Sequence, residues 1–298
     1  MRIPRPIGGK VVVITGAARG IGEALAVRLA AAGARVALVG LEPDQLRTVT
    51  QRCGPNAAWW ECDVTDQQAL DRIATEIKAH FHRVDVLVAN AGIAVGSTLL
   101  LSDPEAFDRV IEVNLLGSVR TVRAFLPLLV ASSGYYLQIA SLAAMTPAPM
   151  LSAYCASKSG VEAFALSLRT EVAHHGVDVG VAYLSFTDTD MTRGASAMLE
   201  SEEVRRLPGR VSKLYDLDQA MDRLVAGIRR RAPFVYGQSF IRWIRPLRWL
   251  VPSLTYRTAR GGAARIEQDL AKRGVEGSMP IGAGGQADTA ARKQRDRA

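Results

Sequence analysis

The chain has 298 residues, of which 48% are hydrophobic, and a formal net charge of +8. This length and composition can supply the core of one large domain. The sequence contains no run of 18 apolar residues, so we predict no membrane-spanning helix. From position 229 to the end there are 15 Lys/Arg against 5 Asp/Glu, a net charge of +10, which leaves the first 228 residues at −2. Because the basic residues belong to the C-terminal part and not to the main domain, we expect no nucleic-acid partner.

Strand-like and helical segments alternate along the first 236 residues. Short β-branched or apolar runs predict buried strands, and apolar spacings of three and four predict helices. We predict strands at 10–14, 35–39, 57–61, 84–89, 135–140, 177–184 and 234–236, and helices at 21–32, 66–80, 103–126, 152–174 and 217–231. This alternation predicts an α/β fold of Rossmann type: a doubly wound, mainly parallel, seven-stranded sheet with helices on both faces.

A glycine-rich turn, 15–22, joins the first strand to the first helix. Gly16 permits a tight turn, Gly20 allows the backbone to approach a pyrophosphate, and Gly22 allows close packing of helix on strand. The amino terminus of the following helix would face the phosphates. A glycine loop in this position predicts a dinucleotide site.

A second group of polar residues lies between 141 and 158. Tyr154 and Lys158 are four residues apart on a predicted helix, so their side chains share one face, and a cation beside a phenol favours the phenolate. Ser141 follows a predicted buried strand, at the end of the sheet where ligands of such folds bind. Taken alone, a Tyr and a Lys at this spacing are more often a packed ring and a solvated amine.

With the glycine turn, Cys62-Asp63-Val64 and Asn90-Ala91-Gly92 in the same order, the sequence resembles the short-chain dehydrogenase/reductase family over residues 9–236. The resemblance implies an oxidoreductase that moves hydride between NAD(P)(H) and a carbonyl or alcohol, needs no metal and forms homodimers or homotetramers. It implies a catalytic set of four residues: Asn114, Ser141, Tyr154 and Lys158. Asn114 would sit in a kinked helix and hold a water that links the lysine to solvent. The residues that would bind the cofactor are Gly16, Ala18, Arg19, Gly20, Ile21, Gly22, Asp63, Val64, Asn90, Ala91, Gly92, Tyr154, Lys158 and Thr189.

Two residues bear on the choice between NAD and NADP. The position at the end of the second strand, where an acidic residue would bind the ribose 2′-hydroxyl, is Gly40. Glu42 either reaches that hydroxyl or is an exposed carboxylate at a helix entry. Arg19 is placed as in relatives that bind the 2′-phosphate, which favours NADP.

Other positions leave alternatives open or depart from the family. Asp63 would contact the adenine, although Asp63 or Thr65 could equally cap the helix at 66–80. The usual Pro-Gly after the sixth strand is replaced by Leu184-Ser185, which leaves the path of that loop open. Residues 191–215 stand where the family has a mobile substrate lid.

The composition changes after residue 236. Residues 237–273 form a basic, aromatic extension in which Arg and Trp alternate with Leu and Ile. This pattern suits either a membrane interface, through 240–260, or a cover over the cleft or a subunit interface. Either arrangement suggests a hydrophobic, steroid-, retinoid- or lipid-like substrate. Residues 274–298 read as a disordered tail.

The cellular compartment and two rival functions complete the interpretation. The N-terminus shows no apolar signal segment, and Cys53, Cys62 and Cys155 lack metal-ligand spacing, so we expect free thiols in the cytoplasm, with peripheral membrane contact as the variant. A nucleotide-sugar epimerase shares this fold, but the glycine spacing and the lack of a second substrate domain argue against it. A catalytically silent NAD(P)-binding sensor or scaffold is the other alternative.

Overall fold

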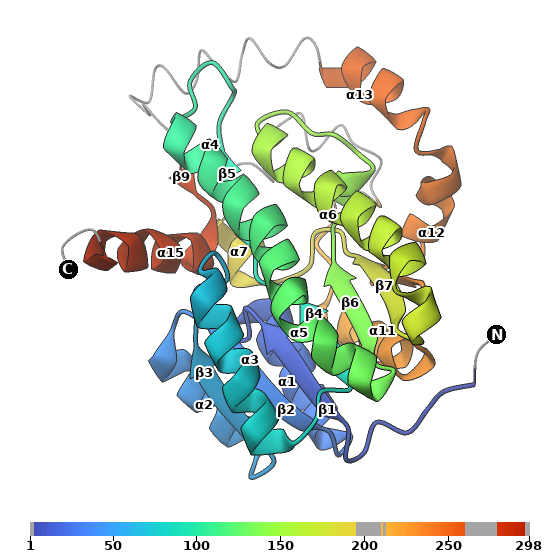
Figure 1. Ribbon diagram of the computed structural model, residues 1–298. Coiled ribbons are helices and arrows are strands. Elements are labelled where there is room, and N and C mark those ends of the chain that lie inside the picture. Colours follow the sequence, from blue (N-terminus) through green and yellow to red (C-terminus); the bar gives the residue numbers. More distant parts are fainter. Residues whose placement is uncertain (1–2, 195–209, 211–212, 260–278, 296–298) are drawn as a thin grey trace.

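A computed structural model of the chain describes residues 3–194, 210, 213–259 and 279–295. Its centre is one seven-stranded sheet in the order β3-β2-β1-β4-β6-β7-β8, with every pair parallel (Figure 1). The strands are β1 Val11–Thr15, β2 Arg35–Gly40, β3 Ala57–Glu61, β4 Val86–Ala89, β6 Tyr135–Ile139, β7 Asp178–Tyr183 and β8 Phe234–Tyr236. The predicted fold class is confirmed. The strand order reverses between β1 and β4, which is where open α/β sheets bind ligands.

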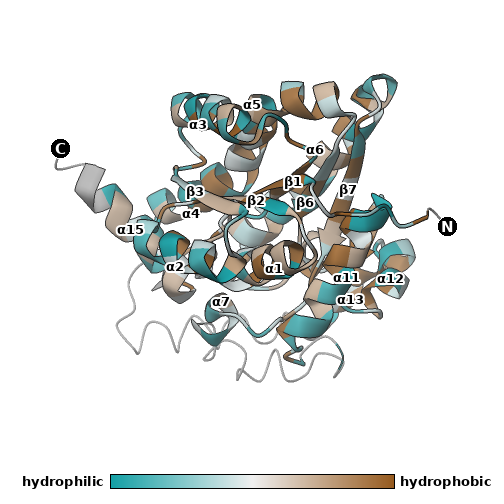
Figure 2. Cartoon of the chain, turned by 90° about the horizontal axis from the view of Figure 1, so that it is seen from below, coloured by the Kyte–Doolittle hydropathy of each residue, from teal (hydrophilic) through white to brown (hydrophobic). Residues whose placement is uncertain are grey.

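Helices cover both faces of this sheet, as the view from below shows (Figure 2). On one face lie α1 Gly20–Ala31, α2 Pro43–Cys53 and α11 Leu217–Arg230. On the other lie α3 Gln67–Phe81, α5 Gly117–Ser132 and α6 Ser152–Glu171. The central strands are buried on both sides, which explains why β1 and β6 are nearly continuous apolar runs.

Two helices near the site begin at side-chain caps. Asp66, and neither Asp63 nor Thr65, caps α3 by accepting a hydrogen bond from the Ala69 amide at 3.0 Å. Asp103 caps α4, Pro104–Ile111, in the same way. The helix then widens into a π-helical turn, Glu112–Leu116, before α5. Such turns interrupt the regular bonding of a helix and are frequent at functional sites.

The whole stretch Pro104–Ser132 is long and apolar enough to cross a membrane by length and hydropathy alone. The sequence prediction had no such segment. A core helix passes the same criterion, and this one packs against α3 and α6 with Phe125 and Leu129 buried. The core therefore accounts for part of its apolar surface.

The C-terminal part contains more structure than predicted. After β8 the extension forms α12 Ile241–Ile244, a 3₁₀ turn Arg245–Leu247 and α13 Val251–Ala259. The predicted disorder from residue 274 is wrong for 279–295, where β9 Met279–Pro280 pairs with β5 Val95–Gly96 and α15 Gly282–Arg295 follows. Contacts with residues distant in the sequence hold this segment in place, and a local sequence pattern does not reveal such contacts. Most of the predicted lid, 191–215, lies outside the described residues. Its described parts are 191–194 in α7, Asp190–Gly194, residue 210 and 213–215.

Candidate active site

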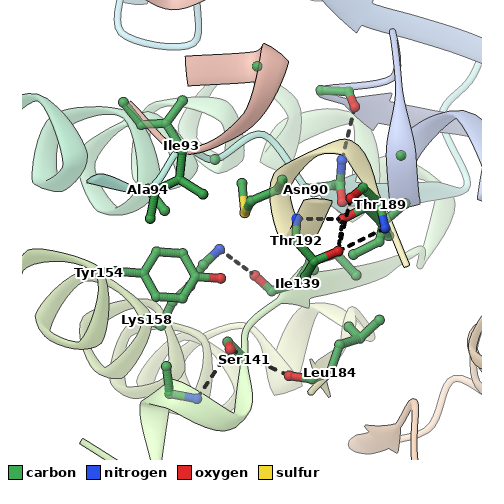
Figure 3. A pocket seen from close by; sticks show the side chains of 18 of the residues that line it. Asn90, Ile93, Ala94, Ile139, Ser141, Tyr154, Lys158, Leu184, Thr189 and Thr192 are labelled. Carbon is green, nitrogen blue, oxygen red and sulfur yellow. Dashed lines mark hydrogen bonds between the residues drawn. The ribbon is translucent and has the colours of Figure 1, made fainter. Parts of the chain in front are cut away.

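One cavity of about 700 Å³ opens at the carboxyl ends of the central strands. It extends from the glycine turn past the ends of β4 and β6 to the C-terminal extension. The close-up shows Ser141, Tyr154 and Lys158 on one side of this space and Asn90 and Thr189 on another (Figure 3). The structure therefore brings residues that are far apart in the sequence to one site.

The glycine turn is fixed by very close packing. A Cβ on Gly22 would lie 2.2 Å from the Gly16 carbonyl oxygen, and one on Gly16 would lie 2.8 Å from the Ala91 Cα, so neither position can carry a side chain. The Asn90 amide donates hydrogen bonds at 3.0 Å to the carbonyl oxygens of Thr15 and Gly16. Asn90 thereby ties the end of β4 to the turn after β1.

Both proposed cofactor selectors lie at the edge of the cavity, and they bind each other. The Arg19 guanidinium makes two hydrogen bonds to the Glu42 carboxylate, one of them 2.9 Å long, and pairs with Asp190 at 3.2 Å. Glu42 is therefore not merely an exposed carboxylate at the entry to α2. One cation lies between two carboxylates at this edge of the cavity.

Asp63 and Val64 line the far end of the cavity. One Asp63 carboxylate oxygen accepts hydrogen bonds at 2.9 Å from the Thr65 amide and hydroxyl, and the other pairs with Arg109 at 3.1 Å. Val64 packs closely on Gly117, since a Cβ added to Gly117 would lie 2.7 Å from the Val64 Cγ2. Both side chains are thus held in fixed positions.

Ser141, Tyr154 and Lys158 meet as the spacing predicts. Ser141 begins a 3₁₀ turn, 142–144, and its Oγ accepts a hydrogen bond from the Ala143 amide at 3.1 Å. The Lys158 Nζ lies 5.6 Å from the centre of the Tyr154 ring and donates to the Ile139 carbonyl oxygen at 3.3 Å. The lysine is 4% exposed, so its charge is removed from water.

Protonation in the site differs from the sequence-based expectation. Burial raises the pKa of Tyr154 to about 12, although a hydrogen bond with Ser141 acts in the opposite direction. Burial also lowers the pKa of Lys158 to about 8. The expected lowering of the tyrosine pKa by the lysine is therefore not what this structure shows, because desolvation dominates at both groups.

Asn114 is fully buried in the π-helical turn. Its Oδ1 accepts from the Ile93 amide at 2.8 Å, and its Nδ2 donates to the Ile93 carbonyl and to the Ser157 Oγ, both at 2.9 Å. It also lies beside the lysine, since a Cβ on Gly92 would be 3.1 Å from the Asn114 Oδ1 and 3.3 Å from the Lys158 Nζ. Asn114 thus joins the loop after β4, the widened helix and α6.

The loop after β7 follows a defined path without the usual Pro-Gly pair. The buried Gln238 accepts a hydrogen bond from the Ser185 amide at 2.8 Å and donates to the Thr187 Oγ1 at 3.2 Å. Thr189 lies 3.7 Å from where a Cβ of Gly20 would be, so the loop faces the glycine turn. The Ser185 Oγ is buried, lines the cavity and has no hydrogen-bond partner among the described residues.

Sequence reasoning missed several residues at the cavity. Ile281, Gly284, Ala287 and Asp288 line it and belong to a segment predicted to be disordered. Arg109, which binds the lining residues Asp63 and Asp288, was not singled out either. In the sequence, Arg109 is one of several charged residues on an amphipathic helix, and nothing in that pattern distinguishes it. The C-terminal residues occur in a Gly- and Ala-rich stretch without periodicity, so no local signal marked them.

The residues present fit a dinucleotide. Gly20 has a φ of +57°, and the nearest atoms to a Cβ there would be those of Thr189 at 3.7 Å, so the backbone can approach a ligand at this position. Gly92 keeps the space beside Asn114 and Lys158 clear, and the buried Ser185 Oγ lacks a hydrogen-bond partner among the described residues. The fold and this site define a dinucleotide-binding α/β protein with a Tyr-Lys pair at one end of its cleft.

Comparison with known proteins then gives the family. The family model for short chain dehydrogenases matches residues 10–200. The 3-oxoacyl-(acyl-carrier-protein) reductase FabG of Escherichia coli strain K12 is 30% identical over 233 residues, which are 78% of this chain and 94% of that enzyme. The chain belongs to the short-chain dehydrogenase family and is an NAD(P)-dependent oxidoreductase.

Other similar proteins cover the same region. The fatty acyl-CoA reductase of Acinetobacter baylyi is 35% identical over 191 residues, 62% of this chain and 65% of that enzyme. Among solved structures, a metagenomic short-chain oxidoreductase in complex with NADP is 37% identical with a TM-score of 0.57, covering 60% of this chain and 83% of that one. Levodione reductase has a TM-score of 0.69 at 23% identity, covering 75% and 91%.

Proposed function

We propose that this protein is an NADP(H)-preferring reductase or dehydrogenase of an apolar carbonyl or alcohol, with Ser141, Tyr154, Lys158 and Asn114 as its catalytic set. The observation that carries the proposal is the convergence of the first three in one largely apolar cavity that also contains the glycine turn. When bound, the nicotinamide would supply or accept the hydride. Ser141 would hold the carbonyl oxygen, and the Tyr154 hydroxyl would donate a proton to it.

The titration of the site supports these roles. A Tyr154 pKa near 12 keeps the phenol protonated at neutral pH, which is the form that a proton donor needs. Lys158, with a pKa near 8, is charged at neutral pH but close to exchanging its proton. Asn114 would hold the backbone next to that lysine. For the reverse reaction, cofactor binding would have to make the phenol more acidic.

The preference for NADP(H) rests on Arg19. Its guanidinium lies at the mouth of the ribose site, and a phosphate is a strong partner for a planar, bidentate donor. Glu42 acts in the opposite direction, because it competes for Arg19 and would repel the phosphate. The NADP complex of the metagenomic oxidoreductase supports the same choice.

An apolar substrate is supported by the apolar residues of the cavity that are not in the proposed cofactor set. Pro147, Pro149 and Met150 line it from the loop after β6, and Ile244 and Val251 line it from the extension. The names of two relatives, FabG and the fatty acyl-CoA reductase, indicate acyl chains as one such class.

The experiment that tests the function is a spectrophotometric screen at 340 nm with NADPH and NADH. The substrates would be acyl, long-chain, steroid, retinoid and aromatic carbonyls and alcohols, with Tyr154→Phe as the matched control. Losing the proton donor should lower turnover by about 10²- to 10⁴-fold. Nucleotide binding without turnover above the Tyr154→Phe background would contradict the proposal and favour the sensor or scaffold.

We further propose that the extension contacts an anionic membrane surface. Its exposed apolar side chains, which we call the aromatic surface, are Trp243, Leu247, Trp249, Leu250, Leu254 and Tyr256. Residues 238–259 contain four Arg and no Asp or Glu, so the surface is complementary to anionic lipid headgroups. Leu254 also lines the cavity, so the surface lies at its rim.

Vesicle sedimentation tests this contact. The wild-type protein should sediment with phosphatidylglycerol-containing vesicles more than with pure phosphatidylcholine vesicles, and Trp243→Ser with Trp249→Ser should abolish the difference. Leu99→Ser with Leu100→Ser removes equally exposed side chains elsewhere and should leave it unchanged. Equal sedimentation of wild type and the Trp variant would refute the membrane contact and leave a cover over the cleft.

A homodimer or homotetramer is proposed from the helix at Pro104–Ser132. Only 33% of its most apolar window is buried within one chain, and Leu116 is 42% exposed. A second copy would cover such a surface. Light scattering should give at least a dimer for the wild type and a smaller species for Leu116→Glu, and a wild-type monomer would contradict the proposal.

A further inference from the structure

The C-terminal segment Met279–Arg295, which we call the C-terminal strap, lies beside β5 and α7 (Figure 1). Four of its residues line the cavity: Ile281, Gly284, Ala287 and Asp288. The strap begins at the end of the cleft that contains Tyr154. There β9 pairs with β5, and the Ile281 amide donates to the Ala94 carbonyl oxygen at 2.8 Å. Ile281 is 8% exposed and packs with Ala94, Leu151 and Cys155. The strap is therefore anchored in the apolar wall near the catalytic residues.

The next part of the strap, at Gly282 and Gly284, packs against α7 and Arg19. A Cβ on Gly194 would lie 2.4 Å from the Gly282 nitrogen, and Gly282 has a φ of +75°, so two backbones meet where only glycines fit. A Cβ on Gly284 would lie 3.9 Å from the Arg19 Cδ. The strap thus reaches the ribose end of the site.

Its far contact is an ion pair at the adenine end. The Arg109 Nε and Nη2 donate to the two Asp288 carboxylate oxygens at 3.0 and 2.6 Å, and Nη2 also pairs with Asp63 at 3.1 Å. The exposed fractions of the side chains are 10% for Arg109, 6% for Asp288 and 7% for Asp63. One buried cation therefore holds both Asp63 and the strap, and its charge is compensated on both sides.

We propose that the C-terminal strap is a wall of the cofactor site and that the Arg109–Asp288 pair is the latch that keeps it closed over the adenine half. The strap completes the site and does not block it, because about 700 Å³ remains open with the strap in place. That volume is in the range of cofactor pockets. The strap residues that line the opening near Asp288 are small, Gly284 and Ala287. This inference rests on the proposed nucleotide site being used.

A pair of matched substitutions on α15 tests the wall. Ala287 lines the cavity and Ala290, three residues on, is exposed. Ala287→Phe places a ring in the adenine space and should weaken binding of NADPH by at least tenfold, measured by the fluorescence of the bound nucleotide. Ala290→Phe adds the same ring outside and should bind as the wild type does. Equal affinities for both variants would overturn the inference.

A second pair tests the latch. Asp288→Asn removes one carboxylate from Arg109 while Asp63 still compensates the cation, so the fold should persist. We expect NADPH to dissociate about tenfold faster in stopped flow, as for the loss of one charge-assisted pair. Arg292, on the same helix as Asp288, pairs with the exposed Glu105 of α4 at 3.4 Å. Glu105→Gln removes this exposed ion pair and should leave the dissociation rate unchanged. Unchanged dissociation from Asp288→Asn, or tighter binding, would overturn the latch.

A truncated ligand locates the effect and separates the two hypotheses. Reduced nicotinamide mononucleotide lacks the adenine half, so its affinity should respond to neither Ala287→Phe nor Asp288→Asn, and an equal response would refute a role at the adenine. If the wild-type protein binds neither NADPH nor NADH, the proposed function fails. If it binds them and the variants match the wild type, only the strap inference fails.

Discussion

Replacing the buried lysine should make the protein more stable and inactive. Burial lowers the pKa of Lys158 from 10.5 to about 8, so the folded state binds this proton more weakly than the unfolded state does. The pKa difference, multiplied by about 1.36 kcal/mol per pH unit, gives a cost of about 3 kcal/mol for keeping the amine charged at pH 7. Lys158→Met keeps most of the volume and removes that charge.

The Ile139 carbonyl oxygen does not lose its only partner in this variant. The Gln138 side chain donates to the same oxygen at 3.1 Å, so little should be lost with the lysine hydrogen bond. A net gain of about 2 kcal/mol would raise the melting temperature by several degrees in a domain of this size. The assay is urea unfolding of nucleotide-free protein, wild type against Lys158→Met.

The pH dependence distinguishes charge from packing. Because the folded pKa is below the unfolded one, the unfolded state binds more protons between about pH 8 and 10.5, and wild-type stability from this group rises with pH across that window. The gap between variant and wild type should therefore be largest below pH 8 and smaller by about 2 kcal/mol at pH 9.5. The exposed Lys78→Met is the control. A variant less stable than wild type at pH 7, or a gap independent of pH, would refute this reasoning.

Three further predictions concern the cofactor end and the π-helical turn. Glu42→Gln frees Arg19 from a competing carboxylate, so the kcat/KM ratio of NADPH over NADH should rise by about tenfold, and a ratio that falls would contradict the proposed selector. Gly22→Ala places a Cβ 2.2 Å from the Gly16 carbonyl oxygen, so nucleotide titration should show loss of binding, with destabilisation of at least about 2 kcal/mol in urea. Asn114→Ala leaves the buried Ile93 amide and carbonyl groups unsatisfied and should cost about 2 to 3 kcal/mol by the same measurement; a cost below about 1 kcal/mol would contradict that structural role.

The parts of the site that could be predicted depend on local spacing. The glycine turn lies between a β-branched strand and a helix, and Tyr154 and Lys158 are one helical turn apart. The relative positions of these residues therefore follow from local secondary structure and do not depend on the tertiary surroundings. Ser141 could be placed because a strand end determines where its side chain can be. For these residues the predicted position and the observed one agree.

Other properties depend on tertiary surroundings that spacing does not record. The Tyr154-Lys158 spacing predicts an encounter but not which group is more strongly desolvated, and burial decides both pKa values. The strap has a composition typical of disorder, and a two-residue pairing with β5 and the buried Arg109–Asp288 pair fix its place. Contacts so distant in sequence leave no periodic pattern to read.

Cofactor preference has the same tertiary origin. The end of β2 is the glycine Gly40, so the position that is usually informative carries no charge. The electrostatics there come from Arg19, placed between Glu42 and Asp190, which lies 171 residues away in the chain. A 2′-phosphate would have to compete with two carboxylates for one guanidinium, while a 2′-hydroxyl could accept from Arg19 and donate to Glu42. Selectivity therefore depends on how far α7, and the strap packed on it, holds Asp190 against Arg19 when a nucleotide binds.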